Sequence, residues 1–252
     1  CDNPYMPRVK GLDPNHLAFS GIGAWADSIV FRQFEPADTT RKGGMSLRLS
    51  LRHLALHEKS GLALTHAHGR MVMDTLSLAI PQLTLRTPSS EAGIRARMDL
   101  DAFAGSRPGQ FAVHMTASVG KADLLHYVGI ASPQTLNGCK ALFRNYPDRP
   151  LALAADARGN LRQVAVSRFE ASLPSAFRIR ARGQASDFLD ARRLKARAAF
   201  AARTRNIGFV STLLPASFSK TFRIPHGLSL HGTASARGSR YEASLCLQEG
   251  KG

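Results

Sequence analysis

Histidines are the residues whose spacing in this sequence comes closest to that of a chemical site. The chain has nine of them, and the densest group is His53, His57, His66 and His68. In an extended strand His66 and His68 point to the same face, because successive side chains alternate. A zinc centre needs a third or fourth ligand and hydrogen bonds that hold the ligands in place, and neither is evident. We therefore interpret these residues as surface histidines and predict no metal site.

Motifs of catalysis and phosphate binding are absent from the sequence. It has no Gly-x-Ser-x-Gly nucleophile elbow, no Gly-x-x-x-x-Gly-Lys loop and no His-Glu-x-x-His helix. The 18 carboxylates are scattered, and their close sets are Asp99 with Asp101 and Asp187 with Asp190. Asp187 and Asp190 resemble the cap of a turn more than a glycosidase pair. We predict that the chain is not an enzyme, with no catalytic residue and no cofactor.

The three cysteines, Cys1, Cys139 and Cys246, are far apart and odd in number. They form no Cys-x-x-Cys or metal-ligand spacing, so neither a disulfide framework nor a redox motif is expected. Cys246 is interpreted as a small buried or half-exposed thiol. It is placed on the apolar side of its strand, with Leu245 and Leu247 on the other phase, or the reverse if a bulge intervenes.

A formal charge of +16 makes the chain strongly basic, and 26 of the 34 basic residues are Arg. Arginine-rich composition with abundant Ala is also typical of GC-rich genomes. In 46–52 and 94–100 the arginines occupy the polar phase of alternating segments, as a solvated outer wall requires. Aromatic residues are only 7% of the chain, and Phe111, Phe177, Phe200 and Phe209 fall on apolar phases. A solvated face is favoured over a specific polyanion site, and no nucleic-acid partner is predicted.

Strict alternation of apolar and polar residues is the dominant pattern, and it predicts amphipathic β-strands. Between Leu51 and Leu54 the phase slips by one residue, as a β-bulge makes it do. Short polar turns separate the runs, and Pro81 is interpreted as one of these turns. Helical crossovers are missing between most strands, so the sheet should be antiparallel and elongated. The alternating apolar residues that define the predicted face are Leu47, Leu49, Leu51, Leu54, Leu56, Leu62, Leu64, Met71, Met73, Leu76, Leu78, Ile80, Leu83, Leu85, Ile94, Met98, Leu100, Phe111, Val113, Met115, Leu151, Leu153, Phe177, Ile179, Leu228, Leu230, Leu245 and Leu247.

Helical segments interrupt the strands and divide the predicted organisation into three parts. Residues 1–120 form a first run of strands, 121–147 a helical insertion, and 148–252 a second run with a short helix near 206–218. Within the insertion, helices are predicted over 121–129 and 133–145. These helices either plug the open side of a curved sheet or cap its end. The opening stretch predicts two strands joined through Gly21-Ile22-Gly23. We expect the chain to be a piece of a longer protein.

Several phrases of the sequence share one repeating style of strand and turn. They are KSGLALT at 59–65, GRMVMDT at 69–75, LTLRTPSSE at 83–91, ASVGKADL at 117–124, FRIPHGLSLHGT at 222–233 and SRY at 239–241. Together they resemble the AsmA-like superfamily, and within it the TamB-type translocation and assembly proteins of Gram-negative envelopes. The resemblance covers most of 12–252 and consists of structural motifs, so no catalytic residue is carried over. The strong basicity departs from that pattern.

This resemblance implies a mainly β fold, in which an elongated, curved antiparallel sheet with a few short helices forms an open apolar groove, as in a β-taco. It also implies a location in the periplasm, with anchoring to the inner membrane through an N-terminal part outside this sequence. The implied functions are transport of phospholipids between the membranes and outer-membrane protein assembly. The implied partners are phospholipid acyl chains and an outer-membrane barrel assembly protein.

A physical argument for lipid carriage stands beside the resemblance. Removing an acyl chain of about 16 carbons from a membrane costs on the order of 13 kcal/mol, at about 0.8 kcal/mol per methylene. An unbroken apolar stripe offsets that cost without any special site. Two alternatives remain open at this stage: the apolar residues belong to an ordinary closed core, or the sheet is a non-catalytic scaffold that binds a protein partner by strand addition.

Overall fold

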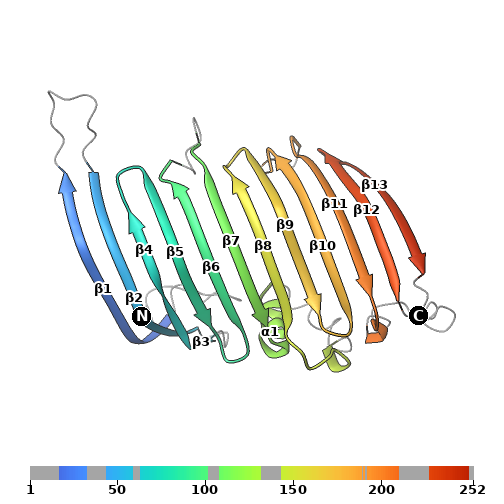
Figure 1. Cartoon of the computed structure of the whole chain (residues 1–252), viewed down its shortest axis with the longest axis horizontal. Coiled ribbons are helices and arrows are strands. Elements are labelled where there is room, and N and C mark those ends of the chain that lie inside the picture. Colours follow the sequence, from blue (N-terminus) through green and yellow to red (C-terminus); the bar gives the residue numbers. More distant parts are fainter. Residues whose placement is uncertain are drawn as a thin grey trace, which may run out of the picture.

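The computed structural model describes residues 17–32, 44–58, 63–101, 108–131, 143–188, 190, 192–209 and 227–249. These residues form thirteen strands and one α-helix (Figure 1). The elements in chain order are β1 (Leu17–Arg32), β2 (Gly44–Glu58), β3 (Ala63–Leu64), β4 (His66–Met73), β5 (Ser77–Arg86), β6 (Glu91–Asp99), β7 (Phe111–Val119), α1 (Lys121–Ala131), β8 (Leu151–Gly159), β9 (Gln163–Leu173), β10 (Phe177–Ser186), β11 (Lys195–Thr204), β12 (Leu228–Arg237) and β13 (Arg240–Glu249).

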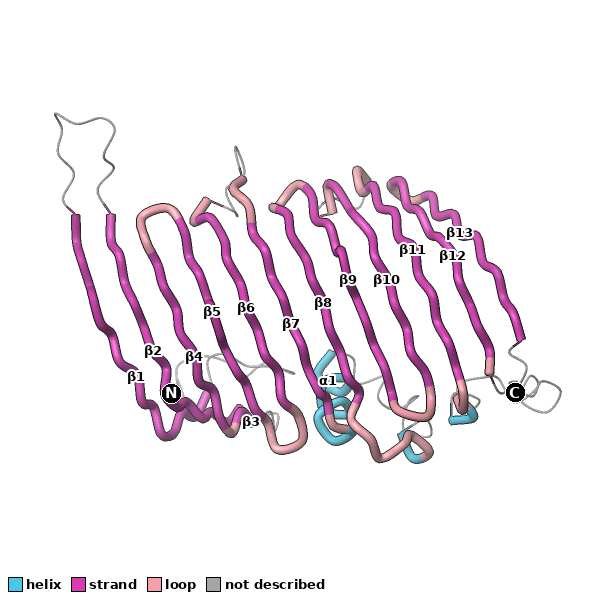
Figure 2. The backbone as a smooth tube through the Cα atoms, in the orientation of Figure 1, coloured by secondary structure: helices cyan, strands magenta, loops and turns pink. Residues whose placement is uncertain are grey.

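All thirteen strands belong to one antiparallel sheet, in which strands follow one another in chain order. The exception is the two-residue strand β3, which pairs with β2 beside β4. The sheet is open, because β1 and β13 lie at its two ends and do not pair with each other (Figure 2). The prediction of a mainly β, elongated antiparallel sheet is therefore confirmed. Short turns join several of the neighbouring strands, such as β4 to β5, β5 to β6, β8 to β9, β9 to β10 and β12 to β13, and antiparallel strands need no more than such a turn.

β-Bulges keep the apolar side chains on one face along several strands. In β2 the residues that pair with Gly23 and Ala24 are His53 and Leu51, so Arg52 is extra and the phase shifts where the sequence predicted it. The interpretation of Pro81 as a turn is wrong. Strand β5 continues through Pro81, and the register shifts between Ile80 and Leu83. A bulge suits proline, since an unpaired position needs no backbone N–H.

The opening stretch forms one strand and not the two that were predicted. β1 runs without a break from Leu17 to Arg32, and the segment Gly21-Ile22-Gly23 is a bulge within it. Gly21 has a φ of 61°, in the left-handed region that glycine adopts at little cost. Its missing side chain also leaves room for the His53 ring, since a Cβ at Gly21 would lie 2.8 Å from that ring. The part of this prediction before Leu17 lies outside the described residues.

Helix α1 lies between β7 and β8, which pair directly with each other across the predicted insertion. The helix predicted over 121–129 is thus confirmed and extends to Ala131. The helix predicted over 133–145 lies mostly outside the described residues, although 143–144 are helical. Of the helix predicted near 206–218, residues 208–209 form a short 3₁₀ turn, and the remainder beyond 209 is outside the described part.

The first turn of α1 is tied to the turn between β5 and β6. The hydroxyl groups of Thr87 and Ser90 donate hydrogen bonds to the Asp123 carboxylate, and the Asp123 N–H donates to Ser89 Oγ at 3.3 Å. The Gly120 N–H donates to Ser90 Oγ at 3.0 Å. Partial burial raises the pKa of Asp123, but the hydrogen bonds from Ser90, Thr87 and Ser89 outweigh this effect and the net pKa is lowered. A carboxylate in the first turn also favours the helix, whose N-terminus carries partial positive charge.

Buried apolar residues are few in the described part, and most of them gather at one end of β8, β9 and β10. Phe143, Tyr146, Leu173 and Ala176 form this cluster. The partly buried residues packed against it are Leu124, Leu125, Leu151, Phe177 and Phe209. We name this set the rim cluster. It packs helix α1 and the segments around 143–146 and 209 against the strand ends, so that most of the apolar face is left outside it.

Candidate functional site

The apolar side chains of the sheet form rows that run across its strands. A row is the set of residues that pair directly on successive strands, and paired residues point to the same face. The Leu85 row is Ala67, Leu85, Ala92, Ala117, Leu153, Ala171, Ile179, Ala202, Leu230 and Leu247. The Met115 row is Gly69, Leu83, Ile94, Met115, Ala155, Phe169, Ala181, Phe200, Gly232 and Leu245. Neither row contains a charged or polar side chain.

Two further rows continue the same face toward the other strand ends. The Val113 row is Ile80, Ala96, Val113, Ala157, Val166, Gly183, Ala198, Ala234 and Ala243. The Phe111 row is Leu78, Met98, Phe111, Gly159, Val164, Ala185, Ala196, Ala236 and Tyr241. With strands about 4.8 Å apart, the four rows cover about 40 Å by 20 Å of sheet.

This apolar face is not sealed by a second layer. Its fully buried members in the described part are Ala67, Ala171 and Leu173, and most others are half-buried. Leu245 and Leu247 on the edge strand β13 are 61% and 64% exposed.

No family model, curated protein or solved structure matches this chain. Its function must therefore be argued from its own surfaces.

Predicted face residues that lie on described strands all fall on this one face. Leu47, Leu49 and Leu51 pair with Met73, Met71 and Gly69, which joins β2 to the rows. Leu54, Leu56 and Leu64 follow after the β2 bulge. Leu151 and Phe177 pack against the rim cluster. Leu76 and Leu100 lie in turns at strand ends, where they are exposed. Leu62 lies outside the described residues.

The sequence missed most of the small members of the rows and one aromatic member, Phe169. Alanines such as Ala92 and Ala117 separate the larger side chains, and Phe169 lies on the same face. Phe200, which the sequence placed on an apolar phase, lies there too. Alanine is ambiguous in a pattern search because it is common on both faces of strands and in helices. Cys246 pairs with His231 on the opposite, polar face and is exposed there, so the interpretation of a buried or half-exposed thiol on the apolar side is wrong. Leu245 and Leu247 occupy the apolar face instead.

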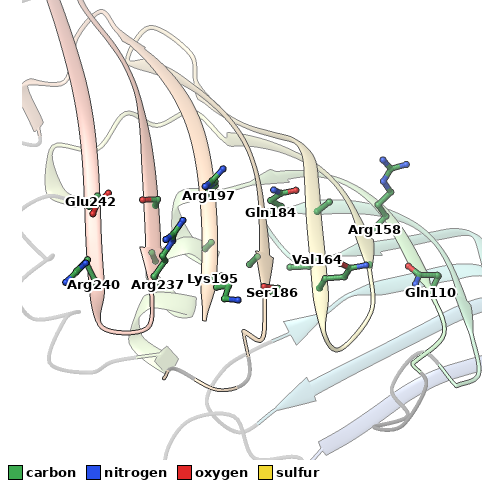
Figure 3. A pocket seen from close by; sticks show the side chains of 17 residues that line it. Gln110, Arg158, Val164, Gln184, Ser186, Lys195, Arg197, Arg237, Arg240 and Glu242 are labelled. Atoms are coloured by element: carbon green, nitrogen blue, oxygen red, sulfur yellow. The ribbon is translucent and has the colours of Figure 1, made fainter. Parts of the chain in front are cut away.

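The opposite face is polar and carries several hollows. Hollows of about 720 and 960 Å³ lie over β8 to β13, and one of about 890 Å³ lies beside the turn that holds α1. The first two are each lined by two polar rows and the apolar row between them, so both open on the polar face. In Figure 3 the side chains of Arg158, Gln184 and Arg197 point to one side of the sheet.

Three of the four histidines in the group predicted from the sequence, His53, His66 and His68, meet on this polar face. His53 Nδ1 and His66 Nδ1 lie 2.7 Å apart, so one ring donates a hydrogen bond to the other. The His66 and His68 ring centroids are 5.3 Å apart, and His68 Nδ1 is buried without a hydrogen-bond partner in the described structure. Among the described residues, no set of three His, Cys, Asp or Glu side chains is arranged to hold a metal ion. The described helix is also too short to cross a membrane.

His66 is expected to make the folded protein less stable as the pH is lowered. Desolvation lowers the pKa of His66 below the ordinary value of 6.5, and His53, His68 and Arg86 lower it further by charge repulsion. The unfolded chain then takes up a proton near pH 6.5 that the folded chain resists. The free energy of unfolding should therefore decrease from about pH 6.5 down to the lowered pKa, and His66→Gln should remove this part of the slope. Urea titrations at several pH values measure it.

The matched control is His231→Gln, at an exposed position of β12 away from the histidine group. It should leave the slope of the unfolding free energy with pH as in the unaltered chain. Equal slopes for His66→Gln and the unaltered chain would contradict the assignment.

Proposed function

We propose that this chain is a segment of a periplasm-spanning envelope protein whose apolar β-face shields lipid acyl chains. The proposal includes transport of phospholipid between the two membranes and support of outer-membrane protein assembly. It places the parent protein in the periplasm, anchored to the inner membrane, with an outer-membrane barrel assembly protein as partner. It involves no catalysis.

The observation that carries this proposal is the continuity of the four apolar rows on an unsealed face. The rows extend over about 800 Å² of sheet, and most of their side chains are only half-buried. Large exposed apolar patches on a protein mark sites that bind an apolar partner. A hydrocarbon chain suits this face because the rows offer apolar contacts along their length and no polar side chain that would bind a polar ligand group. An acyl chain that moves along a row exchanges one apolar contact for another. Its methylene groups therefore stay out of water, where each would cost about 0.8 kcal/mol.

Photo-crosslinking in the full-length parent protein tests the proposal. A photoreactive amino acid in place of Met115 lies in the Met115 row, whereas one in place of Thr116 lies next to it on the polar face. Phospholipid adducts, identified by mass spectrometry, are expected from position 115 and not from position 116. Equal lipid yields at both positions, or only protein adducts at position 115, would refute the lipid-shielding function.

A second candidate function is that of a scaffold that binds a protein by strand addition. The free edge at β13 favours it, because all ten of its residues are exposed and its outer backbone groups have no neighbouring strand in the described sheet. Tyr241, Leu245 and Leu247 would give an added strand an apolar contact. In the same crosslinking experiment this function would yield peptide adducts at Leu247 and no lipid at Met115.

A further inference from the structure

The polar face over β8 to β13 carries a basic hollow that the proposed function does not use. It consists of the hollows of about 720 and 960 Å³, which share Arg158, Gln184, Arg197, Ser235 and Glu242. Six cations line it: Arg158, Arg182, Lys195, Arg197, Arg237 and Arg240. Glu242 is the one carboxylate in this lining. Figure 3 shows most of these side chains.

Cations in this hollow are brought together at close range without compensation. Lys195 pairs directly with Arg237, and Arg237 pairs with Arg240, so three positive charges occupy adjacent strands about 4.8 Å apart. Like charges directly opposite each other destabilise a sheet. Arg197 adds a fourth charge two residues from Lys195, on the same face.

Elsewhere on the polar face, some arginines have carboxylate partners. Arg86 pairs with Glu91 at 3.1 Å, and Glu170 accepts from both Arg168 and Arg180. In the part of the chain that the structure describes, no ion pair engages any of the six cations of the hollow. Six cations without an ion pair that line one hollow beside a single carboxylate point to an external anion.

Phosphate is the anion that this arrangement fits best. Five of the six cations are arginines, whose planar guanidinium groups bind phosphate through two parallel hydrogen bonds. The cations spread over β8, β10, β11, β12 and β13, so a single small anion cannot reach them all. No aromatic side chain lines the hollow, which disfavours stacked bases of single-stranded nucleic acid. The volume lies in the range of small-molecule sites, about 300 to 1,000 Å³.

We propose that the basic hollow binds a ligand with at least two phosphate groups. A bisphosphorylated lipid headgroup and free polyphosphate share this chemistry. The site lies on the face opposite the apolar rows. The proposal of phosphate binding therefore does not depend on lipid shielding by Met115 and its neighbours.

Binding measurements on the full chain test this site with two probes. Calorimetric titration with tripolyphosphate measures a free ligand, and flotation with phosphatidylcholine vesicles, with or without cardiolipin, measures a headgroup. The double variant Arg197→Gln with Arg237→Gln should weaken binding about tenfold or more, the factor that loss of one charge-assisted hydrogen bond gives. Glu242→Gln should tighten binding, because it removes the repelling carboxylate.

The matched control is Arg70→Gln with Arg95→Gln, which removes two exposed arginines from the polar faces of β4 and β6. It should leave the affinity unchanged. Binding of tripolyphosphate would show that a free ligand is sufficient, and binding of cardiolipin vesicles alone would show that a lipid headgroup is needed. Either result supports the site if the hollow variants change the affinity as stated. Absence of binding to both probes, or equal weakening by the control pair, overturns the proposal.

Discussion

Leu85→Asp is expected to abolish co-purification of phospholipid with the chain, and Leu49→Asp is expected to do the same. Leu85 lies in a row of ten apolar residues, with Ala67 and Ala92 directly opposite it. A carboxylate there would contact the acyl chain and lose its hydration, at a cost of several kcal/mol without a partner. Because a hydrocarbon chain lies along the row and not in a pocket, one charge interrupts its contacts on both sides. Mass spectrometry of lipid extracted from the purified protein measures the loss.

Thr84→Asp provides the matched control for this experiment. Thr84 precedes Leu85 in β5 and pairs with His68 and Gly93 on the polar face. The same carboxylate is thus added to the same strand, but it points away from the apolar rows. Far-UV circular dichroism should show that both variants keep their β-structure. Phospholipid retained by Leu85→Asp, or lost equally from Thr84→Asp, would contradict shielding by the apolar face.

The sequence could predict the sheet and its apolar face because a single-layer amphipathic sheet enforces a period of two. Each strand with large apolar residues, such as Phe111, Val113 and Met115 in β7, carries that period plainly. The bulge at Arg52 could also be predicted from the sequence, since Leu51 and Leu54 are out of phase. Pro81 was misread because a proline at a bulge and a proline at a turn follow the same local rule, the loss of one backbone donor.

Strand β11 was not predicted, and its composition explains why. The segment Lys195–Thr204 contains five alanines, which occupy both faces and favour a helix when isolated. Only its neighbours β10 and β12 make it a strand, by pairing along its whole length. The structure of such a segment is therefore decided by tertiary pairing and not by its own pattern.

The basic hollow was beyond sequence analysis for a related reason. Lys195, Arg237 and Arg240 come from three strands, and their direct opposition depends on the register of two strand pairs. One residue of slip would move these side chains to the other face. From the sequence alone each was an ordinary solvated cation, which is why a polyanion site was disfavoured. The approach of His53 to His66 depends on register in the same way.

Leu173→Ala is expected to give a large loss of stability, about 2 to 5 kcal/mol in the free energy of unfolding. Leu173 is 1% exposed and is the one large side chain of the described residues that is fully buried. It joins α1, through Leu124 and Leu125, to the ends of β8 and β10 within the rim cluster. Its truncation leaves a cavity among neighbours that are held by other contacts, so the site cannot close over it. Urea unfolding followed by circular dichroism measures the loss.

Leu245→Ala is the informative comparison, because it removes the same atoms from the apolar face. Leu245 is 61% exposed, and truncation of an exposed side chain typically changes stability by less than about 0.5 kcal/mol. A small effect at Leu245 beside a large one at Leu173 would show that the rim cluster stabilises the fold while the rows remain free for a ligand. Comparable losses at both positions would show that another layer packs on the face, and an acyl chain would then have no open surface to occupy.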